Sequence, residues 1–184
     1  MSIFFVLLLN TPCFSQVELR LGTVYPVRVG TNFLNEGYQS NFGASTELNF
    51  PIYKNWFGQI AYCLFHARVN NPESVGFIAK TGVTHVHVAL GYRLILSPRY
   101  EVDTKLGVGP AIYRHFQDDD RFYDDGTSLT IGAGLLYRIN TDLGIYAGLE
   151  YLRDFLNTEV NAQDRDFFRH TSIINPKLAL SVKF

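Results

Sequence analysis

His85 and His87 are the residues of this chain whose spacing most directly suggests metal chemistry. Residues two apart in an extended strand project from the same face, so both imidazoles could bind one metal ion. A third ligand would have to come from another strand, and Cys63 or Glu101 could supply it. The alternative, which we favour, is a pair of hydrogen-bonded histidines inside the protein. We therefore predict no metal site.

A second candidate cation site is an aspartate-rich segment between residues 118 and 125. Hard cations such as Ca²⁺ prefer sites that are rich in oxygen ligands. The spacing does not match an EF-hand loop, however, and runs of like charge are usually solvated. We interpret the segment as part of an exposed loop. Its acidic members are Asp118, Asp119, Asp120, Asp124 and Asp125.

His170 and Ser172 could place a general base beside a nucleophilic hydroxyl. This His-x-Ser spacing resembles that of the barrel-type lipid A deacylases, and the resemblance implies a carboxylate further along the chain. No Asp or Glu follows Ser172, so Glu150 or Glu159 would have to substitute from elsewhere. No Gly-rich phosphate loop, CxxC pair or HExxH motif is present. We expect no enzyme activity and no cofactor, and a lipid A-modifying hydrolase stays an alternative.

A larger set of charged residues occupies alternate positions in extended segments, opposite an apolar face. Buried charges must be paired, so a shared interior would hold them as an ion-pair network. A gate or narrow conduit for ions is the alternative. Lys183 also lies on the charged face of its segment. The network that we predict consists of Glu18, Arg20, Glu47, Arg93, Glu101, Asp103, Lys105, Arg138, Glu150 and Lys177.

The elements that would position these residues are β-strands, because apolar and polar residues alternate with period two. Most segments have 9–11 residues, about the length that crosses a bilayer as a tilted strand. In the third segment both faces are apolar, which leaves its orientation open. An even number of strands allows the sheet to close, so that no edge is left unpaired in lipid. The eight segments are 17–25, 42–50, 56–65, 85–94, 100–112, 129–138, 143–151 and 174–184.

The face opposite the charges carries Leu, Val, Ile and aromatic residues. A Lys or Arg there would cost about 2–4 kcal/mol at mid-membrane, so a charge at Leu106 should disrupt the protein more than the loss of Lys105. Aromatic residues cluster at both ends of this face, as expected for two membrane interfaces. One girdle is Phe50, Trp56, Tyr92, Tyr100, Tyr137 and Phe184, and the other is Tyr25, Phe42, Tyr62 and Tyr151.

The connections alternate between short and long, as in outer-membrane barrels with short periplasmic turns and long outer loops. Arg beside aromatic residues in the third and fourth long loops is typical of binding surfaces, so an extracellular ligand could bind there. The short turns are 51–55, 95–99 and 140–142. The long connections are 26–39, 68–81, 114–126 and 153–170.

Composition narrows the class further. The chain has 184 residues and a net charge of −1, and 47% of its residues are hydrophobic, yet no apolar run reaches the 18 residues of a membrane helix. No basic stripe argues for nucleic acid. Residues 1–15 are predicted to be a secretory signal cut before Gln16, although no Lys or Arg precedes their apolar run. The alternatives are a first buried strand or, less well matched, a lipidated Cys13. Cleavage would leave Cys63 as the single cysteine.

At residues 16–184 the pattern resembles the eight-stranded outer-membrane barrels of the OmpA/OmpX type, including a terminal strand that ends in Phe184. The resemblance implies an all-β, transmembrane, antiparallel up-and-down barrel in the Gram-negative outer membrane. It also implies contact with lipid and lipopolysaccharide, and recognition of Phe184 by the outer-membrane assembly machinery. A soluble lipocalin-like barrel would need the opposite polarity, with an apolar interior.

The same barrel hosts adhesins, enzymes and pure anchors, so the fold does not decide the function. We expect a closed, non-enzymatic scaffold that serves envelope integrity, or surface and ligand binding through its long loops. An eight-stranded interior is just wide enough to be filled by side chains, which favours closure. A narrow ion-conducting pore is the alternative.

Overall fold

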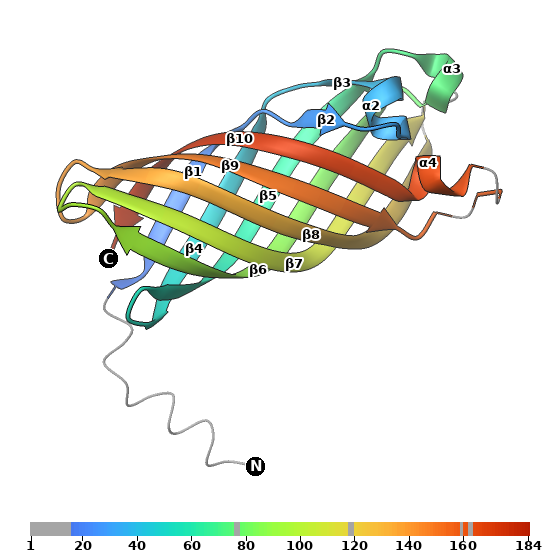
Figure 1. The fold of residues 1–184 in the computed structure, drawn as a ribbon. Helices are drawn as coiled ribbons and strands as arrows, with labels where there is room; N and C mark the ends of the chain where they lie inside the picture. Colours follow the sequence, from blue (N-terminus) through green and yellow to red (C-terminus); the bar gives the residue numbers. More distant parts are fainter. Residues whose placement is uncertain (1–15, 76–77, 118–119, 159, 162–163) are drawn as a thin grey trace, which may run out of the picture.

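The computed structural model describes residues 16–75, 78–117, 120–158, 160–161 and 164–184 (Figure 1). The predicted signal segment 1–15 lies outside these residues. Eight antiparallel strands follow one another around a ring, and pairing of the first with the last closes it. These strands are β1 (Glu18–Val24), β4 (Gly43–Tyr53), β5 (Trp56–Val69), β6 (Lys80–Ile95), β7 (Tyr100–Gln117), β8 (Asp120–Arg138), β9 (Leu143–Leu156) and β10 (His170–Lys183).

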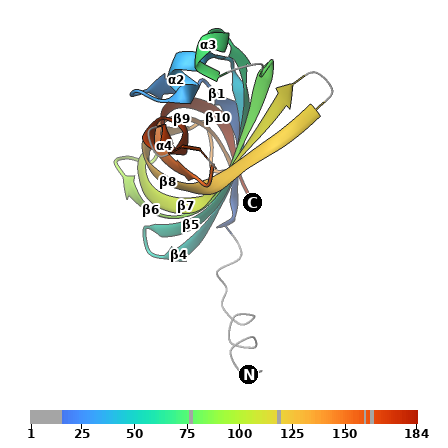
Figure 2. The ribbon, with the colours of Figure 1, turned by 90° about the vertical axis from the view of Figure 1, so that its right-hand side faces the viewer.

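The predicted barrel is thereby confirmed, and so are the faces of its strands. On β7, for example, Leu106 is 65% exposed, whereas its neighbour Lys105 is buried inside the ring. The ambiguous third segment has Phe57 and Phe65 inside and Trp56 and Ile60 outside. Seen end-on, the strands enclose a single narrow interior (Figure 2). Apolar side chains therefore cover the outside of the barrel and polar ones fill much of the inside.

All four predicted long connections contain more regular structure than expected. The segment 114–126 is a correction: β7 and β8 stay paired as far as Gln117 and Asp120, so it is a projecting hairpin. Bilayer thickness limits only the part of a strand that lipid covers. Two neighbouring strands can stay hydrogen-bonded to each other beyond the bilayer, where water surrounds them. The connection 68–81 contains the helix α3 (Pro72–Val75), and 153–170 contains the end of β9 and the helix α4 (Arg165–Arg169).

The connection 26–39 folds back onto the barrel. It comprises β2 (Val27–Val29), the short helix α2 (Phe33–Gly37) and, at its end, β3 (Tyr38–Ser40). β2 pairs with β10 and β3 with β5, so the two strands continue the wall above the ends of β1 and β4. Pro26, which has no N–H to donate, marks the break between β1 and β2.

The three short connections lie together at the opposite end of the barrel, near the C-terminus (Figure 1). In the first, Lys54 has a positive φ of 50°, which a tight turn between Tyr53 and Trp56 requires. In the third, the Asn140 side chain accepts hydrogen bonds from the backbone N–H groups of Asp142 and Leu143. Among the described residues no helix is long and apolar enough to cross a membrane.

Candidate functional site

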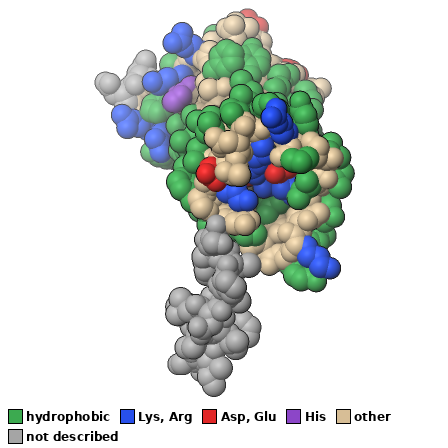
Figure 3. Space-filling model, turned by 90° about the vertical axis from the view of Figure 1, so that its left-hand side faces the viewer, with side chains coloured by type: hydrophobic (Ala, Val, Ile, Leu, Met, Phe, Trp, Pro, Cys, Tyr) green, Lys and Arg blue, Asp and Glu red, His purple; other side chains and the backbone are tan. Residues whose placement is uncertain are grey.

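The turn-proximal end of the interior holds a layer of charged side chains, which we call the lower network. Arg93 contacts Asp103 at 2.7 Å and Glu18 at 3.1 Å, and Arg138 contacts Glu101 at 3.0 Å. Figure 3 shows acidic and basic side chains side by side at the mouth of the barrel. Each carboxylate therefore faces at least one guanidinium. The members of the lower network are Glu18, Arg20, Arg93, Glu101, Asp103 and Arg138.

A second layer, the middle network, lies further inside and consists of Glu47, Lys105, Glu150 and Lys177. The Lys105 ammonium lies 2.9 Å from Glu47, and Lys177 lies 2.7 Å from Glu150. Lys177 also contacts Glu47, and Lys105 donates a further hydrogen bond to Gln59 at 2.7 Å. All four charged side chains are nearly inaccessible to solvent. Each lysine is thus shared between two carboxylates.

The two layers are joined and each is electrically balanced. Arg20 of the lower network approaches Glu47 of the middle network, with 3.7 Å between Nη1 and Oε2. The lower network has three arginines and three carboxylates, and the middle network has two lysines and two carboxylates. The Arg20 guanidinium also stacks 4.0 Å from the Tyr146 ring. The structure therefore brings together all ten residues of the predicted network.

Space for this packing depends on glycine. A Cβ on Gly134 or Gly148 would lie 2.4 or 2.7 Å from atoms of the Tyr146 ring, closer than van der Waals contact allows. The bare backbone at these positions lets the ring lie across the interior beneath Arg20. Glycines on the inward face thus make room for large side chains from other strands.

Above the middle network, His85 binds a carboxylate that the sequence analysis did not identify. Its Nε2 lies 2.9 Å from Asp154, which also accepts hydrogen bonds from Tyr113 at 2.6 Å and Thr171 at 3.1 Å. The His87 ring stacks on that of His85, with 5.6 Å between centroids. Asp154 has the inward parity of Glu150, but the sequence analysis assigned it to a loop. No group of three or more His, Cys, Asp or Glu in the described ranges could hold a metal ion.

The outer end of the interior is filled by apolar side chains, which we call the apolar plug. Phe33 and Leu34 of α2 point into the barrel and are almost completely buried. The Phe33 ring lies 5.9 Å from Tyr113 of β7 and 5.8 Å from Phe168 of α4, measured between centroids. Sequence reasoning missed the plug because it lies in a predicted loop. The signal was Asn32, whose side chain accepts a hydrogen bond from the Asn35 N–H and so caps the helix.

The other candidate sites are not assembled. Ser172 has the outward parity of β10 but is buried, and its hydroxyl accepts a hydrogen bond from Arg153 at 2.6 Å, whereas His170 lies 3.6 Å from Asp166. Glu150 belongs to the middle network, and Glu159 lies outside the described residues. In the aspartate-rich segment, residues 118 and 119 are outside the described range, and Asp124 contacts His115 at 3.1 Å.

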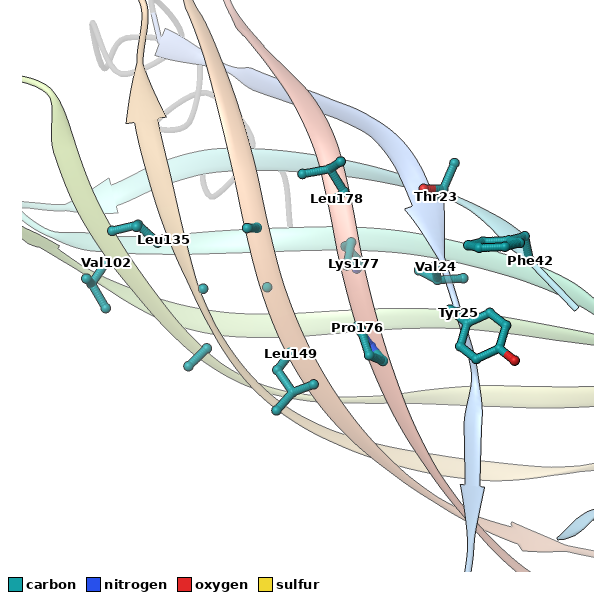
Figure 4. A pocket seen from close by; sticks show the side chains of 14 residues that line it. Thr23, Val24, Tyr25, Phe42, Val102, Leu135, Leu149, Pro176, Lys177 and Leu178 are labelled. Carbon is teal, nitrogen blue, oxygen red and sulfur yellow. The ribbon is translucent and has the colours of Figure 1, made fainter. Parts of the chain in front are cut away.

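The outer wall carries a shallow apolar groove of about 790 Å³ (Figure 4). Leu149, Leu178 and Phe42 project from the wall around it, over small residues that include Ala133 and Ala147. The groove contains no convergent polar groups, so it fits an acyl chain better than a polar ligand.

Phe184 lies at the turn end, 69% exposed, and its N–H donates to the carbonyl of Val17 at 2.9 Å. Its backbone is therefore tied to the barrel while its ring is free on the outside. Lys183, the preceding residue, lines the mouth of the interior with Arg93 and Arg138.

No protein-family model and no curated protein sequence matches the chain. Several solved structures, in contrast, are similar to the chain. The neisserial surface protein A is similar with a TM-score of 0.67 and 10% identity, over 92% of this chain and 96% of that one. Ail of Yersinia pestis gives 0.58 and 15%, over 92% and 99%. Outer membrane protein W of E. coli gives 0.57 and 12%, over 95% and 100%.

These proteins share the fold of the chain described above over almost their whole length. At such low identity the likeness concerns the fold. The chain therefore has the transmembrane β-barrel fold of the small eight-stranded outer-membrane proteins.

Proposed function

We propose that the protein is a closed, non-enzymatic scaffold of the Gram-negative outer membrane that acts through its outer surface. The observation that carries the proposal is the filled interior. The charge-balanced networks occupy its turn-proximal half, and the apolar plug of α2 occupies its outer end. To pass through the barrel, a solute would have to break several buried ion pairs. Each break would leave buried charges unpaired, which is costly.

The location rests on the fold and on the surface. An apolar outer face between two aromatic girdles suits a lipid bilayer, and the solved barrels with this fold include the outer membrane proteins OprG and W. The short turns would face the periplasm and α2, α3 and α4 the outside. Secretion would require the signal segment 1–15 and cleavage before Gln16, and lipid and lipopolysaccharide would surround the mature barrel.

The surface role is envelope integrity or the binding of an extracellular ligand. The hairpin formed by β7 and β8 carries exposed Phe122 and Tyr123, and such aromatic residues are enriched at recognition sites. Ail, one of the barrels with this fold, has been crystallised with the heparin analogue sucrose octasulfate. A surface that binds anionic ligands is thus compatible with the fold. The hydrolase alternative lacks support, because Ser172 is bonded to Arg153 instead of to a histidine.

Closure predicts the electrical behaviour of the barrel. The wild-type protein, refolded and inserted into a planar bilayer, should give no large, steady conductance. The double variant Phe33→Ala, Leu34→Ala should also stay closed, because the ion-pair layers lie beneath the plug. A porin recorded in the same bilayer serves as the positive control, because it gives a steady conductance. A stable open level from the wild-type barrel would favour the narrow-pore alternative and refute the closed scaffold.

The C-terminal residue provides a test of assembly. We expect deletion of Phe184 to lower the amount of barrel assembled in the outer membrane of cells, since the assembly machinery would read its exposed ring. Phe184→Tyr, which keeps an aromatic ring, is the matched control and should assemble normally. The measurement is the fraction of protein that resists extraction without detergent. Equal assembly of all three proteins would exclude Phe184 as the recognition residue.

A further inference from the structure

A group of basic side chains lies on the outer surface of β5, β6, β7 and β8, beyond the apolar face. We call it the basic patch and define it as His66, Arg68, Lys80, Arg114 and Arg121, all of which are exposed. In Figure 3 Lys and Arg side chains gather with a His at the upper left of the molecule. None of these residues belongs to the lower or the middle network.

Strand register brings the patch together. Arg68 pairs with Lys80, Lys80 pairs with Phe116, and Phe116 pairs with Arg121, which gives one row across four strands. The row below contains His66 beside Gly82 and, on the far side of Gly82, Arg114. Side chains of directly opposed residues lie about 5 Å apart, so the cations form one continuous surface.

Aromatic rings hold the cations in place without neutralising them. The Lys80 ammonium lies 4.8 Å and the Arg121 guanidinium 5.5 Å from the centroid of the Phe116 ring. Arg114 lies 5.4 Å from the Tyr123 ring. In the described part of the chain no ion pair involves Arg68, Lys80, Arg114 or Arg121, in contrast to the paired cations of the lumen. Their charge is therefore available to an outside partner.

The described carboxylates of the hairpin form no ion pair with the patch. Asp125 pairs with Ile112 and so lies one row below Arg114 on the same face, and Asp120 is exposed at the end of the hairpin. Neither forms an ion pair with the patch. Of the three described aspartates of the hairpin, Asp124 contacts His115, so four cations face Asp120 and Asp125.

The height of the patch identifies its partner. His66 has the same outward parity as Tyr62, which belongs to the outer aromatic girdle, and lies four residues further along β5. Four residues span about 13 Å along a strand, so the patch begins just above the hydrocarbon region. Phosphorylated headgroups of the outer leaflet begin at this depth, so the row with His66 and Arg114 lies level with them and the row with Arg68, Lys80 and Arg121 reaches above it.

We infer that the basic patch binds the phosphate groups of lipid A in the outer leaflet. The inference rests on the proposed outer-membrane location and adds a defined site to it. The cations would contact phosphate oxygens, and the Phe116 and Tyr123 rings would lie against the sugars. The barrel would then carry a bound lipid on the side of its β7–β8 hairpin.

The test compares two triple variants that lose the same charge. The patch variant is Lys80→Gln, Arg114→Gln, Arg121→Gln. The control is Lys54→Gln, Arg99→Gln, Arg165→Gln, which removes exposed cations from the turns and from α4. Fluorescent, bisphosphorylated lipid A is titrated against each barrel in neutral detergent. Each cation near an anionic headgroup contributes about five-fold in affinity, so the patch variant should bind about 100-fold more weakly and the control as the wild type does.

Two further arms identify the ligand chemistry. Wild-type affinity should fall steeply when the salt concentration rises and when dephosphorylated lipid A replaces the native form. Equal affinity of the patch variant and the wild type for lipid A would overturn the inference. Patch-dependent binding of heparin with no patch-dependent binding of lipid A would overturn it as well. If the wild-type barrel failed to insert into a bilayer at all, the proposed location itself would be wrong, so the two failures are distinguishable.

Discussion

Replacement of Glu47 by leucine is expected to lower the free energy of unfolding by about 3–5 kcal/mol, the usual cost of breaking a buried ion pair. Glu47 contacts both Lys105 and Lys177, and its side chain is only 1% exposed. Without it, both ammonium groups would share the single carboxylate of Glu150, and one buried positive charge would be uncompensated. Denaturant unfolding of the barrel in lipid vesicles measures the loss.

The matched control restores the charge balance. Glu47→Leu combined with Lys177→Met removes one charge of each sign and leaves Lys105 paired with Glu150 at 2.5 Å. The double variant should therefore be more stable than the Glu47→Leu protein, because a buried pair can be replaced by apolar residues at little cost. If the single variant unfolded like the wild type, the networks would contribute nothing to the stability of the barrel.

Leu106→Arg is expected to cost about 2–4 kcal/mol through a different mechanism, the transfer of a charge into the hydrocarbon region. Leu106 lies outside the barrel near the middle of β7 and is 65% exposed to what would be lipid. Leu106→Met, which keeps the side chain apolar, should change the unfolding free energy by less than about 1.5 kcal/mol. Equal stabilities of the Arg and Met variants would place this strand outside the bilayer.

The structure changes the expected cost of replacing the neighbouring residue, Lys105. From the sequence pattern, the loss of Lys105 should matter much less than a charge at Leu106. Lys105, however, contacts Glu47 and Glu150 and donates a hydrogen bond to Gln59. Its removal would leave two buried carboxylates with one lysine, so we now expect a cost similar to that of Leu106→Arg. Alternation reveals which way a side chain points but not how many partners it has.

The wall of the barrel was predictable because two independent patterns agree. Between the two aromatic girdles, charged residues keep to one parity in each strand, and aromatic residues such as Trp56 and Tyr62 end the other parity at both interfaces. A shift by one residue would place Lys105 in lipid and Leu106 in the ion network, so the pattern also fixes the register of the faces.

The ends of the interior were not predictable in the same way. Asp154 and the β7–β8 hairpin lie beyond the lipid-covered part of the strands, where no membrane enforces the alternation. Phe33 enters the barrel through tertiary contact with Phe168 and Tyr113, residues far away in the sequence. The basic patch likewise depends on cross-strand register, which single-sequence patterns do not contain.

The brevity of β1 has a mechanical consequence. β1 has seven residues, whereas β7 and β8 have 18 and 19, so the joint that closes the ring is much shorter than the joint between β7 and β8. Along β10 the neighbouring strand changes from β1 to β2 near Pro176, and β2 contributes only the pairs from Ser172 to Ile174. The cylinder thus has a seam made of two strips with a break at Pro26. Under tension on its N-terminal strand, the barrel would unzip along this seam in two stages, while the remaining strands stayed together as one curved sheet.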